Sequence, residues 1–199
     1  MKALLFIVAF SISIVFTNCK KSSSSIPPST TLKVTVNDNL GNPQSGATVT
    51  LYSTQTDLIN KTSPVASSIT NSNGTVVFDD LSPVQYYWYA KSGCKDNFNG
   101  SVTSIGNLTA NVINTTTVIV SGVGTLRVMN TSTNPYNIYV NGVLTVSSFP
   151  GNSSQDFTEA SQGNYSIRVV QVSGYLLTPT DETFTGTLTC GGTLTTTFP

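Results

Sequence analysis

The chain contains no histidine among its 199 residues, and charged residues make up only 9% of it. The first absence removes the usual general base and the commonest metal ligand, so a Ser-His-Asp triad cannot be built from this sequence. Lysine plus arginine and aspartate plus glutamate number 9 each. Without a basic excess to neutralise phosphates, we expect no nucleic-acid partner. We also expect no cofactor, no bound metal and no enzymatic activity.

The scarcity of charge does not indicate disorder. Hydrophobic residues make up 38% of the chain and aromatic residues 9%, which is enough apolar surface for a buried core. Threonine, serine, asparagine and glycine take the place of the missing charges, and threonine, valine and tyrosine favour strands. No stretch carries a helical period. The sequence therefore predicts an all-β fold.

The one long hydrophobic run lies at the start, where Lys2 precedes apolar and small residues over 3–16. A charged start followed by a run of this length indicates a secretory leader, because a membrane span needs about 20 apolar residues. An uncleaved signal anchor is the alternative. Cys19 follows the run directly and resembles the lipobox cysteine of bacterial lipoproteins, which is diacylated after cleavage. The resemblance implies a lipoprotein signal peptide at 1–18, a lipidated cysteine with a flexible tether at 19–30, and an outer-membrane lipid anchor facing the periplasm or the surface.

Short alternating segments separated by turns begin after the tether, which is the pattern of a β-sandwich. The alternating apolar positions of the first half are Leu32, Val34, Val36, Ala47, Val49, Leu51, Tyr86 and Trp88. Their order, with Gly41-Asn42-Pro43 and Asn73-Gly74 between them, resembles the carboxypeptidase regulatory-like domains of secreted bacterial proteins. This resemblance implies a prealbumin-like sandwich over 31–121.

A second alternating unit covers 122–199. Leu126 and Val128 alternate with polar or flexible residues, and Asn141-Gly142 is a strong signal for a tight hairpin. With the Gly-x-Tyr-x-Ile segment at 163–167, this half resembles a PEGA-type β-domain. We therefore expect two small antiparallel β-sandwiches, prealbumin-like or immunoglobulin-like, in tandem. Because almost no linker separates them, they should pack end to end as a rod.

Two cysteines remain once Cys19 is lipidated. In an exported protein Cys94 and Cys190 are candidates for a disulfide, which would join the two units. The alternatives are two independent buried thiols, or a pair too far apart to bond.

Two tyrosines are candidates for ligand contact. Alternation around Trp88 puts Tyr87 and Tyr89 on the outer face of their strand, where they could stack on a sugar ring or a partner protein. We favour the other interpretation, that they pack against a loop or the second unit.

The acidic residues give no catalytic pattern. Asp156, Glu159, Asp181 and Glu182 fall in segments expected to be solvated loops. The turn over 37–42 is rich in asparagine and aspartate, which favour turns, and it lacks the carboxylate spacing of a calcium loop.

These features favour a membrane-anchored, non-catalytic cell-envelope lipoprotein that acts as a binding, spacer or adhesion module. Its expected partners are the membrane, through the lipid, and an envelope protein or a glycan. The alternative functions are a glycan-binding accessory protein of a polysaccharide-uptake system and a hydrolase that uses carboxylates alone.

The lipid anchor gives a first prediction. Replacing Cys19 with alanine removes the thiol that would carry the acyl chains, so the Cys19→Ala protein should leave the membrane fraction. Metabolic labelling with a fatty acid measures the modification directly. Wild-type protein that carries no label on Cys19 would contradict the anchor.

Overall fold

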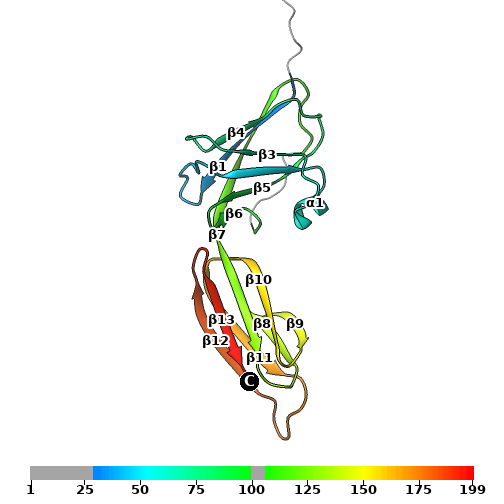
Figure 1. The fold of residues 1–199 in the computed structure, drawn as a ribbon, viewed down its shortest axis with the longest axis vertical. Helices are drawn as coiled ribbons and strands as arrows, with labels where there is room; N and C mark the ends of the chain where they lie inside the picture. Colours follow the sequence, from blue (N-terminus) through cyan, green and yellow to red (C-terminus); the bar gives the residue numbers. More distant parts are fainter. Residues whose placement is uncertain (1–28, 100–105) are drawn as a thin grey trace, which may run out of the picture.

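The computed structural model describes residues 29–99 and 106–199. The predicted leader, Cys19 and the tether as far as residue 28 lie outside the described residues. The described chain forms two β-sandwiches joined end to end, as Figure 1 shows. Within residues 29–99 and 106–199, no helix has the length and apolar character needed to cross a bilayer.

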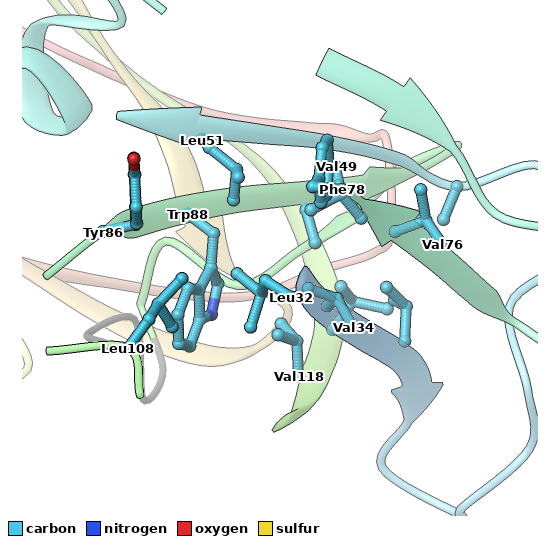
Figure 2. Close-up of a cluster of buried hydrophobic side chains, with 14 residues drawn as sticks. Leu32, Val34, Val49, Leu51, Val76, Phe78, Tyr86, Trp88, Leu108 and Val118 are labelled. Carbon is cyan, nitrogen blue, oxygen red and sulfur yellow. The ribbon is translucent and has the colours of Figure 1, made fainter. Parts of the chain in front are cut away.

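The first sandwich packs a layer of order β4-β1-β7 against a layer of order β3-β2-β5-β6. Its strands are β1 (Thr31–Asp38), β2 (Thr48–Tyr52), β3 (Ala66–Ile69), β4 (Thr75–Phe78), β5 (Tyr87–Ser92), β6 (Lys95–Asp96) and the first part of β7 (Ile113–Asn130). The alternating residues meet between the layers, where Figure 2 shows Trp88 beside Leu108 and Leu32. The predicted inward positions of β1, β2 and β5 are buried.

The second sandwich packs a layer of order β10-β7-β13 against a layer of order β12-β11-β8-β9. Its further strands are β8 (Tyr136–Val140), β9 (Val143–Phe149), β10 (Ser153–Ser161), β11 (Gly163–Gln171), β12 (Asp181–Leu188) and β13 (Thr193–Phe198). The core contains Val128, Tyr136, Ile138, Phe149, Ile167, Val169 and Phe198. The all-β tandem fold predicted from the sequence is confirmed.

Two ladders are parallel, whereas the sequence predicted antiparallel sheets throughout. β1 pairs in parallel with β7, and β13 pairs in parallel with β7. In each sandwich these are the first and last strands, and the intervening strands provide the long crossover that a parallel pair requires. Both parallel ladders use β7.

A short helix interrupts the polar segment 53–63, where no helix was expected. α1 (Gln55–Asn60) begins after Thr54, whose side chain accepts a hydrogen bond from the Asp57 amide at 3.0 Å. Leu58, on the inner side of α1, is buried with Tyr52 and Tyr89 against the outer face of the β2–β5 layer. The helix thus covers part of a sheet face that the sequence left open.

The acidic residues of the second unit lie in strands, not in the solvated loops that were expected. Asp156 and Glu159 belong to β10, and Asp181 and Glu182 belong to β12. Arg127 donates two hydrogen bonds to Asp156 across the β7–β10 ladder. Arg168 contacts Asp181 in the same manner between β11 and β12. The reason is that cross-strand pairing with arginine lets an acid occupy the outer face of a strand.

Candidate functional site: the junction between the sandwiches

One strand belongs to both sandwiches. β7 is 18 residues long; its residues 113–120 pair with β1 and its residues 123–130 pair with β10. The predicted domain boundary, between residues 121 and 122, therefore falls inside a continuous strand. No linker separates the sandwiches, and their relative orientation depends on the contacts around the middle of β7.

Two glycines in β7 allow other segments to approach the strand closely. A Cβ atom on Gly122 would lie 2.0 Å from Gln162 Oε1 and 3.1 Å from Cys190 Sγ. A Cβ atom on Gly124 would lie 2.7 Å from the Gly192 carbonyl oxygen. A side chain at Gly124 would push away the backbone of the β12–β13 turn, and one at Gly122 would displace the Gln162 side chain.

A disulfide crosses the junction. Cys94, in the turn between β5 and β6, is bonded to Cys190, in the turn between β12 and β13, with 5.5 Å between their Cα atoms and a sequence separation of 96. The Val123 amide donates to the Cys94 carbonyl at 2.9 Å, and the Gly191 amide donates to the Val123 carbonyl at 2.7 Å. Both turns are thus hydrogen-bonded to β7 at Val123 and covalently joined to each other.

A β-bulge in β10 brings Glu159 to the other side of the same junction. The register between β10 and β7 shifts between Phe157 and Ala160, and Glu159 has a φ of 59°. This left-handed backbone is uncommon for a non-glycine residue, and bulges often redirect a side chain. The Glu159 carboxylate accepts a hydrogen bond from the Tyr89 hydroxyl at 2.9 Å and forms an ion pair with Lys61. Glu159 therefore links the second sandwich to the first.

Lys61 reaches Glu159 from the end of α1. It is the C-cap residue of the helix, with a φ of 53°. Its ammonium group lies 4.6 Å from the centroid of the Tyr89 ring and 5.1 Å from that of Phe98, within the range of cation–π attraction. Lys61 thus contacts two rings of the first sandwich and one carboxylate of the second.

Tyr89 and Asp96 form the buried base of this cluster. Asp96 is 2% exposed and accepts hydrogen bonds from the Tyr89 hydroxyl at 3.2 Å and from the Phe98 amide at 3.1 Å. Burial raises the pKa of Asp96, and the Phe98 amide opposes that rise. Burial, with the hydrogen bond to Glu159, also raises the pKa of the Tyr89 hydroxyl. Tyr89 therefore keeps its single proton, which it shares between two carboxylates.

Tyr89 packs against a neighbouring segment and the second sandwich, as the favoured interpretation of the sequence expects. Tyr89 does lie on the outer face of β5, as alternation predicts, but α1, Phe98 and Glu159 cover it and leave it 9% exposed. Tyr87 is half-buried against the same cluster. The pair does not form an open platform on which a sugar could stack. The sequence indicated neither of the covering segments, α1 and the β10 bulge.

The asparagine-rich turn after β1 lies at another side of the junction. Asp38 accepts hydrogen bonds from the amides of Leu40 and Asn42, both at 3.0 Å, and contacts Lys95 at 3.2 Å. The Asn42 amide and then the other donors lower the pKa of Asp38 to about 2. The Ser121 hydroxyl in β7 donates to Asn39 Oδ1 at 3.0 Å. Among the described residues no three acidic or thiol side chains gather as a metal site.

A second candidate site lies on the outer face of β11 and β12. A shallow hollow of about 470 Å³ is lined by Asn141, Asn164, Tyr165, Ser166, Thr185, Gly186 and Thr187. None of these side chains is charged. Thr187 donates to Asn164 at 2.7 Å, and Asn141 accepts from the Ser166 amide at 2.9 Å. No pattern in the sequence indicated this hollow, because its residues come from two strands and a hairpin turn.

No family model matches the chain, and no curated protein matches it. The resemblances to regulatory-like and PEGA-type domains therefore stay predictions. Among solved structures, the Bacillus anthracis TIE protein matches 84% of this chain with 17% identity and a TM-score of 0.37. A streptococcal ancillary pilin matches 87% with 14% identity and a TM-score of 0.38. The minor pilin GBS52 of Streptococcus agalactiae matches 84% with 16% identity and a TM-score of 0.34.

The chain spans 33% of the length of the Bacillus anthracis protein and 63% of that of the ancillary pilin. With TM-scores below 0.5, these likenesses carry no functional argument.

The disulfide gives a prediction for stability. The loop that it closes is long, so its loss should lower the free energy of unfolding by about 2–5 kcal/mol. Denaturant unfolding of wild type and of the Cys94→Ala, Cys190→Ala double variant measures the difference. Denatured, unreduced wild-type protein should show no free thiol at Cys94 or Cys190. Two reactive thiols at these positions would contradict the cross-link.

Proposed function

We propose that this chain is a non-catalytic spacer of the bacterial cell envelope, which is tethered to a lipid anchor at Cys19 and holds its second sandwich at a fixed distance and orientation from its first. The observation that carries the proposal is the continuity of β7 through both sandwiches. A flexible two-domain binder would need a linker at this point, and the chain has none there.

The direction of the strands supports a spacer. Thr31, at the start of β1, pairs with Ile113 at the start of β7, and β7 then runs into the second sandwich. At about 3.3 Å per residue, β7 alone spans roughly 60 Å. The end of the tether thus lies at one extremity of the elongated molecule in Figure 1, and the second sandwich extends away from it.

The state of the acidic residues supports a non-catalytic role. A carboxylate pair that hydrolyses a glycoside needs two acids facing a cleft. Asp96 is buried, Glu159 is bound by Lys61 and Tyr89, and Asp156 forms an ion pair with Arg127. Each of these acids is occupied by a structural partner.

The spacer proposal predicts a narrow distance distribution between the two ends. Spin labels on non-natural amino acids at Ala110 and Thr133, both exposed, leave the cysteines intact. Double electron–electron resonance should give one narrow distance peak in wild type. The peak should broaden when Cys94→Ala, Cys190→Ala and Glu159→Ala are combined, because the contacts that support β7 are lost.

A label pair at Thr133 and Val143, within the second sandwich, serves as the control and should be unchanged in the same variant. A broad or two-peaked distribution between the ends of wild type would overturn the rigid spacer.

Glycan binding is the second candidate function, and the hollow on β11 and β12 is the observation that favours it. Neutral hydroxyl and amide groups line it, and they can donate to and accept from sugar hydroxyls without repelling either charge. Tyr139 lies on the neighbouring strand β8. The centroid of its ring is 5.4 Å from the Arg168 guanidinium, so a cation–π pair borders this face.

Binding at the hollow is tested on a glycan array with Asn164→Ala plus Thr187→Ala. The variant should lose at least about tenfold in affinity for any neutral glycan that wild type binds, through the lost hydrogen bonds. Thr193→Ala plus Thr195→Ala, on the other layer of the same sandwich, is the matched control. Equal binding by the hollow variant, or no bound glycan at all, would exclude this candidate.

A further inference from the structure

The loop that joins β11 to β12 carries four exposed large hydrophobic residues, Val172, Tyr175, Leu176 and Leu177. In this loop, residues 172–180, Leu176 is 101% exposed, Leu177 is 92% exposed and Tyr175 is 46% exposed. Leucines are usually buried, and two adjacent fully exposed leucines cost solvation free energy that no contact within the described residues offsets. Such a pair indicates a surface that is covered when the protein works.

The neck of this loop is held closed by a buried glutamine. Gln171 is 8% exposed; its amide group donates to the Ser173 carbonyl at 3.0 Å, and its side-chain oxygen accepts from the Thr180 amide at 3.3 Å. The Gln171 backbone amide also donates to the Thr180 carbonyl at 2.8 Å. The two arms of the loop are thus joined at its base, so the leucines project outward.

The loop lies at the end of the molecule opposite to the tether. Its base contacts the connection that follows β7, because the Val172 amide donates to the Pro135 carbonyl at 2.9 Å. Figure 1 shows the loop protruding beyond the second sandwich, at the far extremity from β1. The exposed leucine pair therefore belongs to the loop at the free end of the elongated molecule.

We propose that loop 172–180 is a lipid-contacting tip, which inserts Leu176 and Leu177 into the hydrocarbon boundary of a bilayer. The tip protrudes, so it would need either a preformed pocket or a fluid apolar phase to receive it. It carries no charged side chain between Val172 and Thr180, which avoids the high cost of bringing charge to hydrocarbon. Tyr175 has an apolar ring and a polar hydroxyl, the combination that suits the headgroup level.

A second copy of the chain is a poorer occupant of the tip. Two leucines and one half-exposed tyrosine from each copy would bury far less than the about 1,000 Å² that a stable interface needs. The hydroxyl side chains of Ser173, Thr178 and Thr180 flank the leucines. These groups can bond to headgroups and water at the depth where the leucines enter hydrocarbon.

The test is partitioning to vesicles of pure phosphatidylcholine, measured by co-sedimentation. The protein is the chain from residue 19 onward with Cys19→Ser, because the leader and an attached lipid would themselves bind membranes. Leu176→Ser plus Leu177→Ser should lower the partition coefficient at least about tenfold, since two buried leucine side chains are lost. Leu40→Ser, at a residue 87% exposed in the turn after β1, is the matched control and should bind as wild type does.

A second measurement reports insertion directly. Leu177→Trp should shift its emission to the blue and be quenched by brominated lipid, whereas Leu40→Trp should not. Absence of vesicle binding by the wild-type sequence, or equal binding by the double serine variant, would overturn the proposal. Vesicle binding that requires anionic lipid would also overturn it. So would a wild-type dimer, detected by analytical sedimentation, that the two serine substitutions abolish. The result is independent of the spacer and of lipidation at Cys19, because this protein carries no lipid.

Discussion

The whole arrangement depends on the hydrogen bonding of one strand to both sandwiches. A bend between the sandwiches would have to occur in β7, where Gly122 pairs with β6 and Val123 pairs with β10. Main-chain groups on neighbouring residues are thus bonded to different sandwiches, and a hinge would break ladders of both at once. Unmade backbone hydrogen bonds in a poorly solvated place are costly. Glycine would normally make this stretch of strand flexible, but here its small size admits the turns that hold the strand.

The polar cluster around Glu159 further restricts the relative orientation of the two sandwiches. A left-handed backbone at a glutamate costs free energy, and it persists only where its surroundings fix it. The ion pair with Lys61 and the hydrogen bond from Tyr89 provide that fixation. Partly buried ion pairs often contribute little net stability, because desolvation offsets their attraction. Because such an ion pair forms only at good geometry, it favours one relative orientation of the two sandwiches. The disulfide lies apart from this cluster, so β7 is supported at two separate places.

The sequence predicted the parts of the fold that follow from local periodicity. Leu32, Val34 and Val36 alternate with polar residues and are buried, because side chains in a strand alternate between its faces. The hairpin at Asn141-Gly142 has positive φ at both residues, as a tight turn of this kind requires. The all-β class, the two units and the absence of a linker all followed from such patterns.

The candidate site was less predictable, because its contacts are between distant segments. β10 is mostly polar and carries a bulge, so its burial pattern has no clean alternation. α1 is too short to show a helical period. Glu159 meets Lys61 and Tyr89 only once both sandwiches have folded, and no spacing in the sequence connects the three residues. Cys94 and Cys190 were recognisable as a pair by chemistry alone, while their proximity depends on turns of different sandwiches.

The scarcity of charge that marks this sequence also affects how its sheet edges are protected. Exposed edges invite pairing with other chains, and many proteins prevent this with charged side chains. This chain has few to use. The edge strands β3 and β4 have four residues each, and the edge strands β9 and β10 carry register shifts in their ladders. Short and irregular edges offer no long template for another strand. The other edge strands of the second sandwich, β12 and β13, have eight and six residues and unbroken ladders. Backbone geometry therefore protects β3, β4, β9 and β10, whereas β12 begins with Asp181 and Glu182, which place charge on its edge.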